Sequence, residues 1–150
     1  MKFRFIWVGR TRDKHYKALQ DDYLQRLSHF VNVETVEVRD SKEGDRPTIE
    51  GKRILEKLNQ STYVCLLDVA GKAKDSYEIA ALIDGWQQDG IREISFIIGG
   101  AEGVSQAVAE RANIVLSLSF LTFTHEMARV VLAEQLYRGF TIIKGFPYQK

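Results

Sequence analysis

Residues 92–103 read REISFIIGGAEG, in which the apolar run of a strand leads directly into a cluster of glycines. Residues 62–69 read TYVCLLDV and are nearly all apolar. Runs of this kind, without polar alternation, are typical of parallel strands that helices cover on both faces. We therefore predict that the two stretches form central strands of a parallel sheet.

Strand and helix patterns alternate along the rest of the chain, which predicts an α/β fold with a mainly parallel sheet and helices on both faces. In the stretch 31–39 the valines change from odd positions, Val31 and Val33, to even positions, Val36 and Val38, which predicts a bulge. The other expected elements are strands over 2–9 and 113–118 and helices over 14–29, from Pro47 through Leu58, from the N-cap Asp75 to Gly90, over 104–111, and from the N-cap Thr124 to about residue 140.

Length and composition suit one domain over residues 1–150, because the chain has 45% hydrophobic residues and is long enough to bury a core. Its net charge of +1 argues against a simple RNA-coating protein, although a dimer can still gather local basic segments. The single cysteine, Cys65, cannot form an internal disulfide or a zinc site, and no metal cluster is expected. We find neither a signal peptide nor a membrane-length apolar run and expect a cytoplasmic protein.

The glycine-rich turn 99–103 is the first candidate ligand site, because glycines let a backbone approach a ligand closely. It does not match the dinucleotide-binding or phosphate-binding glycine motifs, so nicotinamide and P-loop interpretations lose support. A tight turn without any ligand remains an open alternative.

Residues 116–125, LSLSFLTFTH, form the second candidate. An apolar stretch with interspersed hydroxyls can wrap an adenine with apolar walls and backbone hydrogen bonds. Ligands of parallel α/β sheets bind beyond the carboxyl ends of the strands, where both candidate loops are expected. The alternative is a strand that simply leads into a helix cap.

The last helix is apolar around most of its circumference, which indicates burial on more than one side. Either a second subunit covers it, or it is a core helix of a single subunit.

Several motifs in fixed order extend this interpretation: FIWVGR at the N-terminus, Leu67-Asp68 followed by Gly71-Lys72, IGGAEG, LSLSFLTFTH, Arg129, EQLYR at 134–138 and Pro147-Tyr148. Together they resemble the RlmH family of the SPOUT superfamily of methyltransferases. The resemblance covers nearly the whole chain.

This resemblance implies properties that the residue patterns do not. It implies a C-terminal trefoil knot whose loops hold S-adenosyl-L-methionine, a homodimer, and N3-methylation of a pseudouridine in 23S rRNA of assembled ribosomes, without a metal. The implied cofactor-binding residues are Leu67, Gly99, Leu118, Ser119, Phe120, Leu121, Thr122 and Phe123.

Three residues are candidates for catalysis. His125, at a helix start where its pKa should be depressed, can accept a proton, or it is a structural histidine. Arg138 can stabilise negative charge, or it forms an ordinary pair with Glu134 four residues earlier. Tyr148 can stack on or hydrogen-bond the target base. We also expect Arg129 to reach RNA or the other subunit.

Two segments of the chain are basic. In the C-terminal tail, Gln149 stands where the family is expected to have a histidine; we favour a role in positioning rRNA, and a frayed terminus is the alternative. Arg10, Arg12, Lys14 and Lys17 either grip rRNA phosphates or form a solvated helix face. The departure at Gln149 leaves open a second hypothesis, a SPOUT methyltransferase with another RNA target. A third hypothesis, from another class, is a noncatalytic ribosome-binding dimer that retains the fold.

Overall fold

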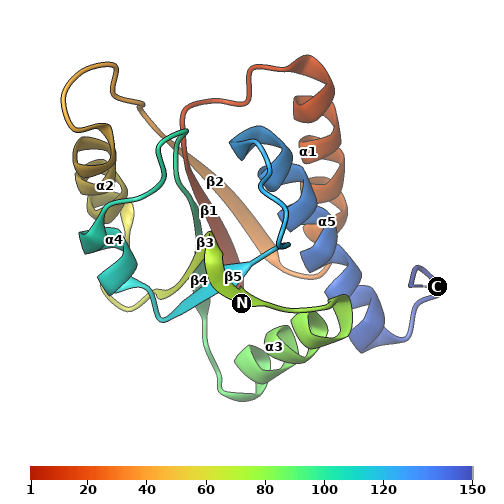
Figure 1. The fold of residues 1–150 in the computed structure, drawn as a ribbon. Helices are drawn as coiled ribbons and strands as arrows, with labels where there is room; N and C mark the ends of the chain where they lie inside the picture. The colour runs from red at the N-terminus through yellow and green to blue at the C-terminus, as the bar shows by residue number, and fades with distance from the viewer. Residues whose placement is uncertain (150) are drawn as a thin grey trace.

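A computed structural model describes residues 1–149, and Figure 1 shows its five-stranded sheet. The strand order is β2-β1-β4-β3-β5, and every neighbouring pair is parallel, which confirms the predicted α/β class. The two predicted central strands, at 62–69 and 92–98, lie side by side in it. The strands are β1 (Lys2–Val8), β2 (Asn32–Val38), β3 (Tyr63–Ala73), β4 (Glu93–Ile98) and β5 (Ile114–Ser117).

Helices cover both faces of the sheet, as predicted (Figure 1). One core lies between the sheet and α1, α3 and α5, and is rich in aromatic side chains such as Phe3, Phe96 and Phe140. The other core lies between the sheet and α2 and α4, and contains Ile54 and Val108. The helices are α1 (Lys14–Leu27), α2 (Arg46–Lys57), α3 (Ser76–Gln88), α4 (Gln106–Arg111) and α5 (His125–Lys144).

The predicted N-caps are present. The Asp75 carboxylate accepts from the backbone N–H of Glu78, and the Glu78 side chain accepts from the backbone of Asp75, so the capping box forms. The Thr124 hydroxyl accepts from the backbone N–H of Met127. Because that cap stops α5 from extending backward, the preceding residues form a loop at the edge of the sheet.

The predicted bulge in β2 is wrong. β2 pairs with β1 in unbroken register from Lys2↔Asn32 to Val8↔Val38. Its valines divide between the two faces instead: Val33 packs on the aromatic core, and Val36 and Val38 pack on the other core. Because helices cover both faces, a change in apolar parity does not require an extra residue.

The irregularity lies in β3. Its pairing with β5 shifts between Leu67 and Lys72, so the intervening residues leave the ladder. A Cβ at Gly71 would come within 2.8 Å of the carbonyl of Val115, so a glycine permits the strand to return beside β5. The residues outside the ladder begin where the main pocket lies.

The last helix is longer than predicted and ends at Gly145, whose φ of 71° forms the left-handed cap. It packs against both α1 and α3 of the same chain. These two neighbours bury much of its apolar surface, while Val131 and Ile142 stay partly exposed.

Candidate functional site

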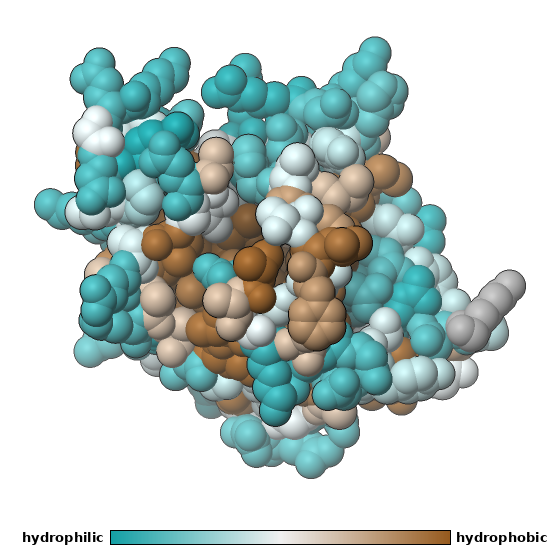
Figure 2. Space-filling model, viewed as in Figure 1, coloured by the Kyte–Doolittle hydropathy of each residue, from teal (hydrophilic) through white to brown (hydrophobic). Residues whose placement is uncertain are grey.

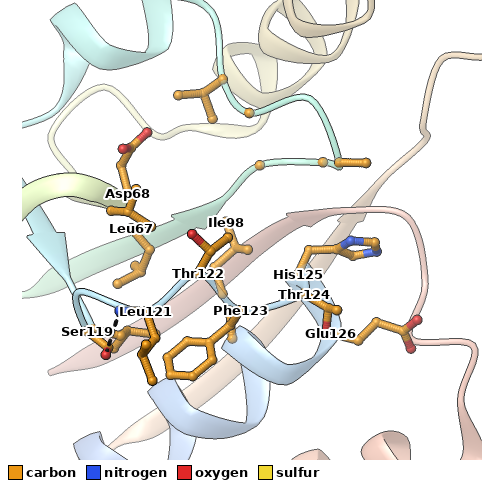
Figure 3. A pocket seen from close by; sticks show the side chains of 18 of the residues that line it. Leu67, Asp68, Ile98, Ser119, Leu121, Thr122, Phe123, Thr124, His125 and Glu126 are labelled. Atoms are coloured by element: carbon orange, nitrogen blue, oxygen red, sulfur yellow. Dashed lines mark hydrogen bonds between the residues drawn. The ribbon is translucent and has the colours of Figure 1, made fainter.

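A cavity of about 650 Å³ opens at the carboxyl ends of β3, β4 and β5. We call it the main pocket, and Figure 3 shows it from close by. In Figure 2 apolar side chains gather around a hollow in the middle of the molecule. Its lining residues are Asp13, Tyr16, Leu67–Val69, Ile98–Ala101, Gly103, Val104, Leu118, Ser119, Leu121–Glu126 and Ala128.

The structure brings both candidate loops and the end of β3 together around this one cavity. Seven of the eight predicted cofactor-binding residues line it. The exception is Phe120, whose side chain is 93% exposed and does not belong to the lining. Phe120 is directed to solvent, while the residues on either side of it form part of the wall. The seven are Leu67, Gly99, Leu118, Ser119, Leu121, Thr122 and Phe123.

Local hydrogen bonds shape the 116–125 loop. The Ser117 hydroxyl donates to the carbonyl of Ser119 at 2.8 Å, and the Ser119 hydroxyl accepts from the backbone N–H of Leu121 at 3.0 Å (Figure 3). Short side-chain bonds of this kind stabilise irregular backbone at the end of a strand. The hydroxyls that the sequence placed in this loop therefore hold its shape.

The glycine-rich turn has structural reasons for its glycines. The Gly103 N–H donates to the carbonyl of Gly100 at 3.0 Å, and Gly103 has a φ of 85°. A Cβ at Gly99 would meet Val104 Cγ1 at 2.6 Å and the Gly103 carbonyl oxygen at 2.9 Å. The turn is therefore tight, and it also forms one wall of the main pocket.

Sequence reasoning missed several lining residues. Asp68 directly follows a predicted ligand residue at the end of a buried strand, so its position was a usable signal. It accepts from the backbone N–H of Ala70 at 2.8 Å. Asp13 and Tyr16 come from the start of α1, and nothing in their spacing indicates that α1 begins beside this cavity.

Of the three predicted catalytic residues, His125 alone lines the main pocket. It begins α5 directly after the N-cap. Burial lowers the pKa of its imidazole, and the positive charge of Arg129 one turn later lowers the pKa further. The pKa of His125 is therefore shifted in the predicted direction, and desolvation on burial is the largest cause.

The expectation that Arg129 reaches RNA or another subunit is wrong. Its side chain is fully buried, and its guanidinium lies 4.8 Å from the ring centroid of Trp7. It donates to the carbonyl oxygen of Val8 at 2.7 Å and to the Thr11 hydroxyl at 2.8 Å. Burial lowers its pKa to about 10. α5 turns this side chain inward because the end of β1 offers it acceptors and an aromatic ring.

The other two predicted catalytic residues lie together at the far end of α5. Arg138 forms an ion pair with Glu134, as the i,i+4 alternative predicted, and donates to the Gln149 side-chain oxygen at 2.7 Å. Tyr148 donates to Glu134 at 3.1 Å, and its ring lies 4.7 Å from the Arg138 guanidinium carbon. We call these four residues the tail cluster. None of them lines the main pocket.

The described residues, 1–149, contain neither a membrane-length apolar helix nor a cluster of metal-ligating side chains. No helix in this range is both long and apolar enough to cross a membrane. Within the same residues, His, Cys, Asp and Glu nowhere gather into a group of three or more that could hold a metal ion.

Comparison with known proteins identifies the class. Residues 1–149 match the family described as "Predicted SPOUT methyltransferase". The chain belongs to this family, and it is a methyltransferase. Family membership also implies the C-terminal knot.

Three relatives that match over nearly their full length are each named Ribosomal RNA large subunit methyltransferase H. The protein of Streptococcus agalactiae is 38% identical over an alignment of 159 positions, which covers 100% of both chains. The protein of Bacillus pumilus is 40% identical with the same coverage. The protein of Caldicellulosiruptor saccharolyticus is 36% identical and covers 98% of this chain and 99% of its own.

Proposed function

We propose that this protein transfers a methyl group from S-adenosyl-L-methionine to N3 of a pseudouridine in 23S rRNA of the large ribosomal subunit. One observation carries the proposal: the 99–103 and 118–123 loops and Leu67 line a single cavity. Family membership and the printed name of the relatives support it. The proposal takes residues 1–150 as one methyltransferase domain that works in the cytoplasm on assembled ribosomes.

The main pocket suits an adenosyl group in size and chemistry. Its volume lies within the usual range for small-molecule sites, roughly 300–1,000 Å³. Ile98, Leu118 and Phe123 provide apolar walls for a flat ring, and the loop backbone provides hydrogen-bonding groups. Asp68 provides a carboxylate for hydroxyl or ammonium groups. When bound, S-adenosyl-L-methionine supplies a methyl group already activated by its sulfonium.

His125 has the position and the protonation state of a proton acceptor. The N3 of a pseudouridine carries a proton that must leave before or during methylation. Because burial and Arg129 lower the pKa of His125, its imidazole is neutral at physiological pH and has a free lone pair. The structural alternative remains, and a His125→Gln variant with unchanged turnover would favour it.

The tail cluster can act on the same base only if it comes from a second subunit. Arg138 is thirteen residues after His125, about 20 Å along the helix axis. In a homodimer the partner's tail cluster can lie beside the main pocket, where the Arg138 guanidinium would stabilise negative charge on the base. Tyr148 would hydrogen-bond or stack on that base. Gln149, held by Arg138, would position the rRNA.

Exposed apolar side chains on the loop support the homodimer. Phe120 is 93% exposed and Leu121 is 70% exposed, beside the mouth of the main pocket. Large apolar residues placed together on a surface mark interaction sites more often than isolated ones do. A second subunit seated there would bury them and close the pocket toward the RNA.

Two measurements test the proposal. Calorimetry with S-adenosyl-L-methionine should show binding, and no binding at millimolar cofactor would favour a noncatalytic ribosome-binding dimer. Mass mapping of 23S rRNA from a deletion strain should show loss of one methyl from a pseudouridine. Loss of a methyl from another base would instead favour a different RNA target, the alternative that Gln149 keeps open.

A further inference from the structure

A second cavity of about 220 Å³ adjoins the main pocket. The two cavities share Gly100, Ala101, His125 and Glu126, so only the glycine-rich turn and the start of α5 separate them. We call the second cavity the arginine pocket. Its lining residues are Val8, Gly9, Arg10, Arg12, Asp40, Arg46, Gly100, Ala101, His125 and Glu126.

Three guanidinium groups from two separate segments line this pocket. Arg10 and Arg12 follow the end of β1, and Arg46 begins α2. Among residues 1–149, neither Arg10 nor Arg12 forms an ion pair. Arg46 is 3.8 Å from the Glu102 carboxylate, and its buried Nε–H has no hydrogen-bond partner within the described residues. The pocket therefore holds donors that no side chain or backbone group among residues 1–149 satisfies.

Two carboxylates also line the pocket, and one of them already has partners. Glu126 accepts from the backbone N–H of Arg12 at 2.7 Å and of Asp13 at 3.0 Å. This contact fastens the segment after β1 to the start of α5. Asp40 is the other carboxylate. The buried cation of Arg129, bonded to the carbonyl of the lining residue Val8, adds positive charge behind the wall.

The chemistry of the lining favours a phosphate over a nucleobase. Guanidinium groups bind phosphate oxygens with paired hydrogen bonds. A splayed-out base is usually stacked on an aromatic ring, and the one aromatic side chain in this lining is His125, which the main pocket shares. Phosphate contacts fix the register of a nucleic acid, while another site reads the base.

We propose that the arginine pocket binds a phosphodiester of the RNA substrate beside the nucleotide that is methylated. This inference rests on the proposed function, because the shared wall places the phosphate next to the methyl donor. The basic residues between positions 10 and 17 therefore have different roles. Arg10 and Arg12 line the pocket, whereas Lys17 lies on α1 and pairs with Asp21 at 2.7 Å.

Direct binding tests the pocket without any need for turnover. A fluorescein-labelled single-stranded RNA is titrated with the full-length protein, and its anisotropy is followed over a range of KCl concentrations. Arg12→Gln and Arg46→Gln should each weaken binding about tenfold and reduce the slope of log K against log salt by about one. Lys17→Gln, which removes the same charge from the same segment, should stay within twofold of wild type.

A neutral backbone separates phosphate from base contacts. With a methylphosphonate version of the same RNA, wild type and Arg12→Gln should bind equally weakly. A difference that persists with this probe would overturn the proposal in favour of a base contact. Equal losses in Lys17→Gln and Arg12→Gln would also overturn it, since the effect would then be one of general charge.

Measurements of methyl transfer can contradict the phosphate site and the proposed function separately. With ribosomes from a deletion strain, Arg12→Gln and Arg46→Gln should raise KM about tenfold and leave kcat and cofactor affinity unchanged. A wild-type protein that methylates no ribosome but shows the arginine-dependent RNA binding would contradict the proposed function alone. Wild-type KM in both variants would contradict the phosphate site alone.

Discussion

The two ends of α5 each hold one arginine, and the two side chains meet opposite surroundings. Arg129 is fully buried among neutral groups, the carbonyl of Val8 and the Thr11 hydroxyl. Arg138 is a quarter exposed and pairs with the Glu134 carboxylate. One residue type on one helix is therefore part of the interior in the first half and lies partly exposed in an ion pair in the second.

The difference follows from what lies opposite the helix. The end of β1 lies against the first half of α5, so a long side chain there is enclosed and must find acceptors in the interior. The C-terminal tail lies against the second half, and a carboxylate one turn away balances the charge at the surface. We therefore expect the loss of Arg129 and the loss of Arg138 to have different consequences for stability and for activity.

The largest expected effect is on stability at the buried end. Arg129→Ala leaves a cavity beside Trp7 and removes the donors to Val8 and Thr11, so the free energy of unfolding should fall by about 3 kcal/mol. Urea denaturation measures it. The matched variant Arg138→Ala should lose less than about 1 kcal/mol, because a partly exposed ion pair contributes little. Equal losses would remove the contrast between the two ends.

The second-largest expected effect is on the rate of methyl transfer and follows from the loss of Arg138. If Arg138 stabilises charge on the target base, Arg138→Ala should lower kcat for methyl transfer about 100-fold. Cofactor affinity measured by calorimetry should not change, because Arg138 lies outside the main pocket. Methyl transfer at the wild-type rate would reduce Arg138 to a structural pair with Glu134.

The same variant can test the shared site. When Arg138→Ala is mixed with a variant whose main pocket no longer binds cofactor, subunit exchange should restore part of the activity. Each hybrid dimer would contain one intact pocket beside one intact tail cluster. Failure to recover any activity after verified exchange would argue that each chain works alone.

A smaller effect, on cofactor affinity, is expected from a substitution in the glycine-rich turn 99–103. The Cβ of Gly99→Ala meets Val104 and the Gly103 carbonyl, so the turn must shift and cofactor affinity should fall about tenfold, or about 1.4 kcal/mol. Gly85→Ala in α3 is the control, since nothing lies within 4 Å of its added Cβ. That control should stabilise the protein slightly. Unchanged affinity in Gly99→Ala would show that the turn tolerates a side chain.

The smallest effect is the pH dependence at the start of α5. The folded protein holds the pKa of His125 below its ordinary value of 6.5, so below about that pH the unfolded chain binds a proton that the folded chain does not. Stability should therefore fall as the pH drops from 6.5 toward the lowered pKa. His125→Asn should flatten this part of the profile, measured by denaturation at a series of pH values. An identical slope in the variant would assign the acid sensitivity to other groups.

Much of the fold could be predicted from local patterns. The runs at 62–69 and 92–98 indicated central parallel strands, and Asp75 and Thr124 marked helix starts, because burial and capping leave direct traces in neighbouring residues. The bulge in 31–39 could not be judged in this way. Apolar parity within a strand reports which faces are buried, and it does not report whether the strand pairs in register.

The candidate site, too, could be predicted only in part from the sequence. By itself the sequence determined the parallel α/β class, the two loops that line the main pocket and, through ordered motifs, the methyltransferase family. Only the tertiary structure decided that Phe120 is directed to solvent, that Arg129 is buried and that Arg46 joins Arg10 and Arg12 in one pocket. Periodicity encodes contacts within an element, whereas these outcomes depend on which distant segments the sheet order brings side by side.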